Sequence, residues 1–162
     1  MELPNGLDAA LKPLLGPETL IIGMGNSLRG DDAVGPFICE KLKRTIPRQV
    51  IDVGTVVENY IQRIIKRNPK VLLIIDAIDF GAQPGEMRLL DRRQVRSAAI
   101  STHSLSPQLF LEVVCRSISP EVCFLAIQPA RTRLGESLTP PVEQAGHALA
   151  EWIGNCLTCP RS

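Results

Sequence analysis

The sequence predicts an α/β protein, a three-layer α/β/α sandwich around a mostly parallel, twisted sheet of about five strands with one short antiparallel edge strand. Three observations lead to this prediction. Short apolar runs alternate with helical patterns along most of the chain, which is typical of βαβ units. Residues 70–77, KVLLIIDA, form a continuous apolar run of the kind found in sheets covered on both faces. The turn sequence QPGE at 83–86 precedes a short run at 87–90, which we expect to be the antiparallel edge.

The first half of the chain is predicted to contain two strands, each followed by a helix. Residues 19–23, TLIIG, indicate the first buried strand, and residues 49–53, QVIDV, the second. Residues that share one helical face, apolar apart from Lys41, follow each strand. They are Val34, Phe37, Ile38, Lys41 and Leu42, and then Val57, Tyr60, Ile61, Ile64 and Ile65. Thr55 and Glu58 have the spacing of a capping box, which would begin the second helix at about Val56.

The second half is predicted to place the 70–77 run at the centre of the sheet and to add a third helix. Ser106 and Pro107 indicate the start of that helix, where Leu105 would pack against Phe110. Its later apolar residues include Leu109, Val113 and Ile118.

A last strand and a closing helix complete the predicted fold. Residues 121–127, EVCFLAI, indicate the strand, and Thr139 with Pro140 marks the start of the helix. The buried face of this helix is predicted to comprise Val142, Ala145, Leu149, Trp152 and Ile153.

The length of 162 residues suits one domain, since single domains cluster at roughly 100 to 200 residues. We expect residues 1–162 to form that domain, with residues 1–17 as an N-terminal extension packed on it or flanking it, and residues 155–162 as a flexible tail. The net charge of +1 argues against a nucleic-acid or anionic membrane partner. The short basic group at Arg92, Arg93 and Arg96 is interpreted as a solvated face.

Targeting and cysteine patterns point to a cytoplasmic protein. No segment reaches the roughly 20 apolar residues of a membrane span, and the first residues lack the pattern of a secretion signal. The five cysteines are an odd number spread over apparent core segments, which favours reduced thiols over a disulfide framework. Cys156 and Cys159 have C-x-x-C spacing but no second pair, and we interpret the spacing as incidental.

The loop GMGNSLRGDDAVG, residues 23–35, is the strongest functional signal. Leu28 stands where a dinucleotide fingerprint needs its third glycine, and Gly30 is followed by Asp31 instead of the lysine of a phosphate loop. Two adjacent carboxylates would repel a phosphate, so the loop is better suited to approach a cation.

Three polar residues are predicted to meet at the carboxyl edge of the sheet, where loops of α/β proteins converge. Asp32 belongs to the glycine loop, Asp76 ends the central strand and His103 precedes the third helix. Alternatives remain open for each: Asp32 can stabilise a helix start, and His103 can be structural. Asp76 is harder to explain structurally, because a buried carboxylate without a partner costs several kcal/mol.

These motifs resemble those of the hydrogenase maturation proteases, the endopeptidases that trim the large subunit of nickel-iron hydrogenases. The resemblance begins with G-x-G-N-x-L-x-x-D-D-x-x-G and continues through IDVGTVVEN at 51–59 and LLIIDAIDFGAQPGEMR at 72–88. STHSLS at 101–106 and FLAIQP at 124–129 extend it over nearly the whole chain. The pattern is most similar to the branch that serves formate-linked, hydrogen-evolving hydrogenases. Ala33 departs from it, because the family often has glycine after the second aspartate.

The resemblance implies a metal site formed by Asp32, Asp76 and His103. It also implies that the metal is nickel already loaded into the large-subunit precursor, and that a C-terminal peptide is then removed. We therefore expect no tightly bound metal, although divalent ions such as cadmium, zinc or calcium can occupy such a site in crystals. We further expect a monomer whose partner is the precursor.

Several roles stay open at this point. No catalytic nucleophile or base is assigned, and Asp32 and Asp76 are the candidates. Gly25, Asn26, Asp31 and Glu58 are candidates for substrate binding, although loop packing explains Gly25 and Asn26 equally well and helix capping explains Glu58. The alternative functions are a metal-dependent exopeptidase or amidohydrolase with its own metal, and a hydrogenase assembly chaperone that does not cut.

Overall fold

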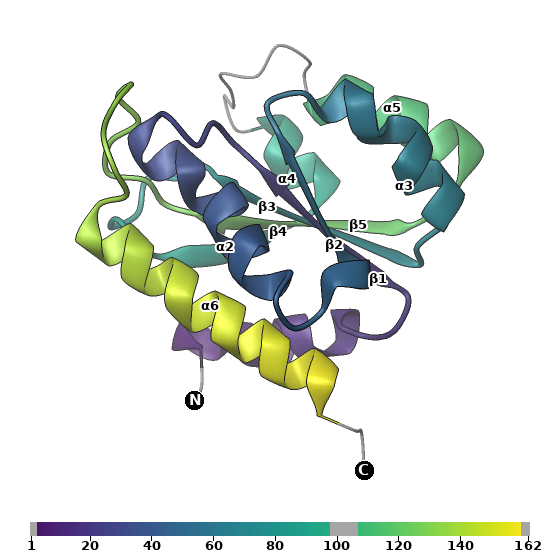
Figure 1. Ribbon diagram of the computed structural model, residues 1–162, viewed down its shortest axis with the longest axis horizontal. Helices are drawn as coiled ribbons and strands as arrows, with labels where there is room; N and C mark the ends of the chain where they lie inside the picture. The colour runs from purple at the N-terminus through teal and green to yellow at the C-terminus, as the bar shows by residue number, and fades with distance from the viewer. Residues whose placement is uncertain (1–2, 98–106, 160–162) are drawn as a thin grey trace.

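The computed structural model describes residues 3–97 and 107–159. A five-stranded sheet runs through the centre with the strand order β2-β1-β3-β5-β4 (Figure 1). Its strands are β1 (Thr19–Met24), β2 (Val50–Gly54), β3 (Val71–Ala77), β4 (Met87–Leu90) and β5 (Glu121–Ile127). β4 pairs antiparallel with β5, and the other pairs are parallel. The predicted fold class is confirmed, including the central position of β3 and the antiparallel edge.

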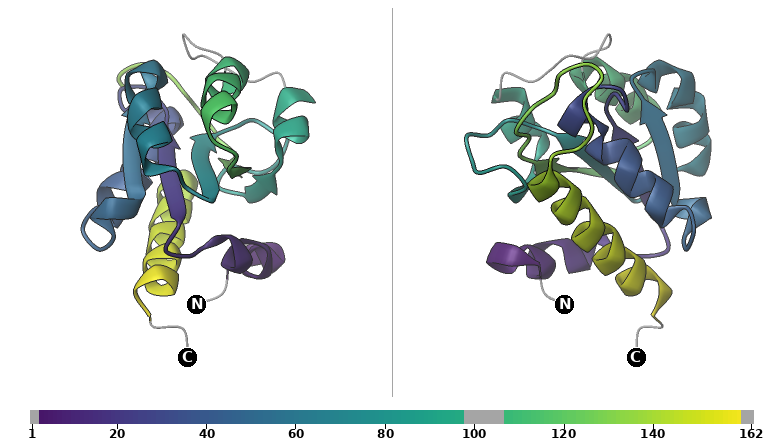
Figure 2. Two further views of the ribbon diagram at one scale, coloured as in Figure 1. Left: turned by 90° about the vertical axis from the view of Figure 1, so that its right-hand side faces the viewer. Right: turned by 60° about the vertical axis from the view of Figure 1, so that its left-hand side comes forward.

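Helices cover both faces of the sheet (Figure 2). One face carries α1 (Leu7–Leu11), α2 (Val34–Leu42) and α6 (Pro140–Thr158), and the other carries α3 (Ile61–Arg67), α4 (Arg92–Ser97) and α5 (Pro107–Ser117). Alternate residues of each strand point to opposite faces, so that Leu73 and Ile75 pack with the first set and Leu72 and Ile74 with the second. Two apolar cores result, which is why the central strand is apolar on both sides.

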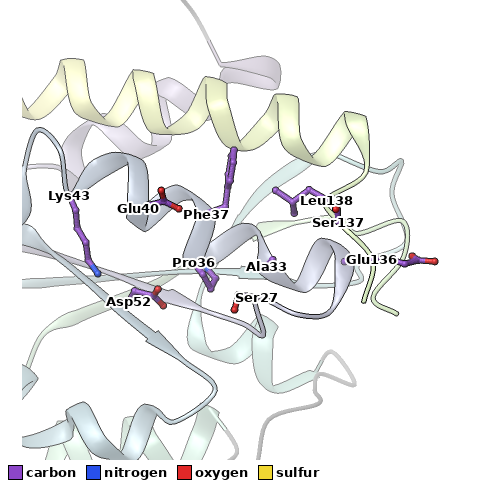
Figure 3. Close-up of a pocket in the computed structure, with 11 residues that line it drawn as sticks. Ser27, Ala33, Pro36, Phe37, Glu40, Lys43, Asp52, Glu136, Ser137 and Leu138 are labelled. Atoms are coloured by element: carbon purple, nitrogen blue, oxygen red, sulfur yellow. The ribbon is translucent and has the colours of Figure 1, made fainter. Parts of the chain in front are cut away.

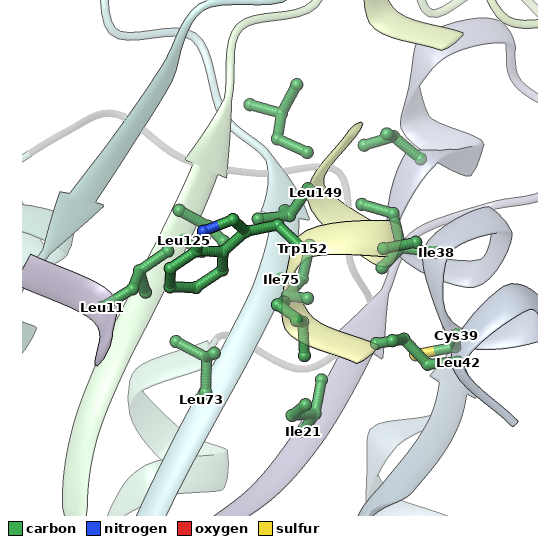
Figure 4. Close-up of a cluster of buried hydrophobic side chains, with 14 of the residues drawn as sticks. Leu11, Ile21, Ile38, Cys39, Leu42, Leu73, Ile75, Leu125, Leu149 and Trp152 are labelled. Atoms are coloured by element: carbon green, nitrogen blue, oxygen red, sulfur yellow. The ribbon is translucent and has the colours of Figure 1, made fainter. Parts of the chain in front are cut away.

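The closing helix α6 supplies the largest side chain of the first core. Trp152 and Leu149 face Leu125 and Ile75 on the strands, next to Ile38 from α2 (Figure 4). The five apolar residues predicted for this helix face are all buried. The N-terminal segment packs on the same core through Leu3, Leu7, Leu11 and Leu15.

Four expectations about local structure need correction. Residues 155–158 form the last turn of α6 rather than a flexible tail, because Cys156 and Leu157 pack against the core. Leu109 is 48% exposed, and α5 buries Phe110, Leu111 and Val114 instead. Helix α4, which begins at Arg92, was not predicted, because the basic residues there were interpreted only as a solvated face.

The fourth correction concerns helix capping. Val56, not Thr55, precedes the 3-10 turn Val57–Tyr60, and no side-chain hydrogen bond caps it. A reciprocal cap does form before α4: the amide of Gln94 donates to Asp91 Oδ1, and the amide of Asp91 donates to Gln94 Oε1, both at 2.8 Å. The capping box expected at Thr55 and Glu58 is thus absent, and the cap at Asp91 and Gln94 was not predicted. The proposed packing of Leu105 lies outside the described residues.

Candidate active site

The glycine loop folds tightly against the carboxyl ends of β1 and β3. Gly25 adopts φ +138°, and a side chain there would overlap the carbonyl oxygen of Asp32. Gly35 lies directly on the backbone of Met24 and Ile75, where a Cβ atom would overlap both strand ends. The two glycines thus let the start of α2 approach the strand ends closely, and this carries Asp32 to the edge where Asp76 lies.

Asp32 is buried but only partly engaged. Its side chain belongs to the 3-10 turn Gly30–Ala33, which packs against β3, and it is 6% exposed. Oδ2 accepts a hydrogen bond from the amide of Asn26 at 2.8 Å. No other described residue donates to this carboxylate, so Oδ1 is available to a ligand or a water.

Asp31 has a different role from the substrate contact expected of it. Its carboxylate is fully buried and accepts hydrogen bonds from the amides of Ala130, Arg131 and Thr139 at 2.7 to 3.1 Å. The Thr139 hydroxyl lies 2.9 and 3.0 Å from the two carboxylate oxygens. Both oxygens of Asp31 are therefore occupied within the protein, which leaves neither of them for the substrate contact expected of this residue. Asp31 fastens the glycine loop to the loop before α6.

Asp76 lies at the same edge as Asp32. It is 2% exposed, pairs in register with Ala126 of β5 and is the penultimate residue of β3. Its position in the strand places it on the face covered by α3 and α5, together with Leu72 and Ile74.

The third expected ligand, His103, lies outside the described residues, shortly before Pro107 where α5 begins. Within residues 3–97 and 107–159, no group of three or more histidine, cysteine, aspartate or glutamate side chains is arranged to hold a metal ion. The metal site with its third ligand His103 stays a prediction.

Two hollows flank the glycine loop on its outer side. One, of about 290 Å³, is lined by Asn26, Ser27 and Asp52 together with residues from Val53 to Val56 and Tyr60. The other, of about 390 Å³, runs along α2 past Pro36 and Phe37 to Lys43 and also reaches the segment before α6 (Figure 3). Ser27 and Asp52 line both hollows, so the two form neighbouring parts of one surface beside Asp32.

Asp52 is a site residue that the sequence reading passed over as part of a strand. It is half-buried on the edge strand β2, and its Oδ1 accepts a hydrogen bond from the amide of Gly54 at 3.0 Å. The available signal was a carboxylate at the middle of an otherwise apolar strand. Glu58, in contrast, is exposed and lines neither hollow.

The backbone amides of Gly25 and Asn26, two of the residues expected to bind substrate, form hydrogen bonds within the protein. The amide of Gly25 donates to Gly54 at 3.0 Å and is thus used within the protein, while Gly25 itself lines the smaller hollow and its substrate contact stays a prediction. The amide of Asn26 is held by Asp32, and Asn26 Oδ1 accepts from Leu28 at 2.9 Å. The side-chain NH2 group of Asn26 donates to no described residue, and Asn26 lines the smaller hollow.

Sequence comparison explains this arrangement. The profile of the hydrogenase maturation protease family matches residues 36–155. The hydrogenase 3 maturation protease of Escherichia coli strain K12 is 33% identical over 143 residues, which cover 84% of this chain and 91% of that protein. This chain belongs to the hydrogenase maturation protease family. It is accordingly a hydrolase of the peptidase class.

Solved structures of the family have the same fold. The crystal structure of a NiFe hydrogenase maturation protease, HycI from Thermococcus kodakarensis KOD1, gives a TM-score of 0.82 at 28% identity, covering 93% of this chain and 99% of that one. The hydrogenase maturating endopeptidase HybD from E. coli gives 0.70 at 27% identity, covering 83% and 88%.

Ala33 and Cys39 are two residues of this chain whose local structure bears on the site. Ala33, which stands where the family often has glycine, has φ −77°, so alanine fits there without strain. Burial raises the pKa of the Cys39 thiol to about 12, and the negative charge of Asp52 acts in the same direction, so Cys39 is not a thiolate nucleophile at neutral pH.

No helix among the described residues has the length and apolarity to cross a membrane.

Proposed function

We propose that this chain is the endopeptidase that removes the C-terminal extension from the nickel-loaded large-subunit precursor of a nickel-iron hydrogenase, with the bound nickel as its recognition element. The observation that carries the proposal is the pair of buried carboxylates, Asp32 and Asp76, at one edge of a family fold. Buried carboxylates are costly unless they bind something, and oxygen ligands with His103 leave coordination positions open on a divalent ion.

The proposed chemistry is carboxylate-based hydrolysis. Asp32 is held by Asn26 through Oδ2, which leaves Oδ1 to take a proton from an attacking water. Asn26 lines the adjoining hollow, where its side-chain NH2 can donate to a substrate carbonyl. The nickel belongs to the substrate, so the enzyme is proposed to release the ion with the product and to act as a cytoplasmic monomer.

The test is incubation with the precursor, followed by the mass of the product. The nickel-loaded precursor should lose its C-terminal peptide and the nickel-free precursor should stay intact. Equal processing of both forms would refute nickel recognition, and an intact tail in the loaded precursor would favour an assembly chaperone. Stoichiometric zinc or manganese in the purified protein would favour a hydrolase with its own metal.

Substitution of the proposed ligands tests the site itself. Asp76→Ala and His103→Ala should each abolish processing while the protein stays folded by circular dichroism. Glu112→Ala, at an exposed position of α5, is the matched control and should cut normally. Unchanged cleavage by either ligand variant would show that the metal site is misplaced.

A further inference from the structure

Two loops come together at the carboxyl edge to form an exposed surface whose most prominent side chains are apolar. Leu28 and Leu134 are 65% and 68% exposed, and the amide of Gly135 donates to the carbonyl oxygen of Leu28 at 2.8 Å. The two leucines therefore belong to directly bonded segments, although they are far apart in the sequence. We call Leu28, Arg29, Arg133 and Leu134 the two-loop surface.

The backbone beneath this surface is extensively hydrogen-bonded. The amide of Gly30 donates to Glu136 at 3.0 Å, and that of Asp31 donates to Arg131 at 2.8 Å. Asp31 adds its carboxylate contacts to the same loop, as described above. A surface fixed in this way loses little conformational entropy when a partner binds, which favours affinity.

The placement of exposed apolar residues singles out this side of the molecule. Single exposed leucines are ordinary, so their number alone carries no weight. Their distribution is informative. The large apolar side chains that are exposed among the described residues all lie in loops or first helical turns at the carboxyl edge of the sheet. They are Leu28, Val56, Leu109 and Leu134. Exposed large apolar side chains among the described residues thus lie at the edge of the sheet where Asp32 also lies.

The charge on the two-loop surface is positive. Arg29 and Arg133 are exposed and form no ion pair with another described residue, whereas Arg131 is paired with Glu136 at 3.6 Å. Apolar centres flanked by arginine are typical of protein interfaces. A partner for this surface should therefore present an apolar patch with acidic neighbours.

We propose that the two-loop surface is the docking site for the folded body of the large-subunit precursor, on the proposed function given above. The surface is continuous with the larger hollow, which Gly30 and Glu136 line, and that hollow also reaches Ser27 of the glycine loop. Docking here positions the precursor so that its C-terminal segment reaches Asp32 and Asp76. Binding energy is then supplied away from the reacting bond.

The test measures precursor affinity separately from cutting. The double variant L28S/L134S should bind the immobilised nickel-loaded precursor about tenfold more weakly and should raise KM similarly, with kcat at saturating precursor unchanged. L28M/L134M, which keeps the apolar surface, should behave like the unmodified protein. Unchanged affinity in the serine variant, or a loss confined to kcat, overturns the docking site.

Charge and self-association are tested with the same assay. R29S/R133S should slow association and weaken its dependence on salt, whereas Arg116→Ser at the far end of α5 should not. If the protein binds the precursor through these residues but does not cleave it, the proposed function is refuted and the docking site is supported. A dimer that L28S/L134S converts to a monomer, with precursor binding unchanged, overturns the docking site in favour of a second copy.

Discussion

The two loops next to Asp32 and Asp76 are held by different chemistry, although both are attached to the segment that follows β5. The glycine loop is held by a buried charge, Asp31. Its carboxylate accepts hydrogen bonds from the amides of Ala130, Arg131 and Thr139. The loop after β3 is held by a neutral side chain, Gln128. Its Oε1 accepts hydrogen bonds from the amides of Phe80 and Ala82 at 2.8 and 3.2 Å, and its Nε2 donates to Asp79 at 3.0 Å.

This comparison shows that one segment, residues 128–139, holds both the glycine loop, which carries Asp32, and the loop that follows Asp76 and the end of β3. Gln128 is 5% exposed and Asp31 is fully buried, so neither attachment is replaced by water if it is lost. A buried charge gains more from its donors than an amide does, but it also costs more when they are removed. The glycine loop should therefore be the more sensitive of the two to substitution.

The largest effect on stability is expected at Asp31, and it should separate this residue from its neighbour Asp32. Asp31→Asn places an NH2 group against backbone donors and should lower the free energy of unfolding by about 3 kcal/mol. Asp32→Asn keeps an acceptor for Asn26, so it should unfold almost normally while losing precursor cleavage. Urea denaturation and product mass measure the two effects. Equal stability of both variants would show that Asp31 is not the main attachment.

A smaller effect is expected at Gln128. Gln128→Met keeps the length of the side chain but leaves the amides of Phe80 and Ala82 without their acceptor, which should cost roughly 2 kcal/mol. Cleavage should also slow, because the loop beside Asp76 loses its attachment to β5. Gln62→Met on the exposed side of α3 is the control and should change neither quantity. If Gln128→Met matched Asp31→Asn in stability, the difference between charged and neutral attachments would be refuted.

Thr139 tests one contact of the charged attachment. Thr139→Val keeps the shape and the backbone amide but removes the hydroxyl that lies 2.9 and 3.0 Å from the Asp31 oxygens. The loss should be about 1 kcal/mol, and Thr139→Ser should largely restore it. Thermal unfolding of the three proteins gives the ranking, and a serine variant as unstable as the valine variant would assign the effect to the methyl group.

The sequence was sufficient for the architecture because its signals are local. Strand β3 is apolar on both faces, and α6 shows its buried stripe from Val142 to Ile153, so burial could be inferred from spacing alone. Convergence of Asp32 and Asp76 at one edge also followed, since parallel strands end on the same side.

The division of labour between Asp31 and Asp32 could not be predicted in this way. The donors to Asp31 come from Ala130 to Thr139, about a hundred positions away, and no local pattern marks them. Sequence position alone made both acids equal candidates for the substrate. Asp52 was missed for a related reason, because its exposure depends on β2 being an edge strand, which is decided by the order of the whole sheet.

The smallest expected effect is the pH dependence contributed by Asp79. Hydrogen bonds from the Gln128 side chain and from the amide of Gly81 lower the pKa of this exposed carboxyl. A lowered pKa in the folded state means that the contribution to stability is present above the usual aspartate pKa, and that it is lost as the pH falls through the folded value. Asp79→Asn should therefore lower Tm slightly at pH 7, and the difference from the unmodified protein should shrink near pH 3. A difference that grows on acidification would contradict the lowered pKa, whereas an unchanged Tm at both pH values would mean that Gln128 holds the loop through the amides of Phe80 and Ala82 rather than through the carboxylate of Asp79.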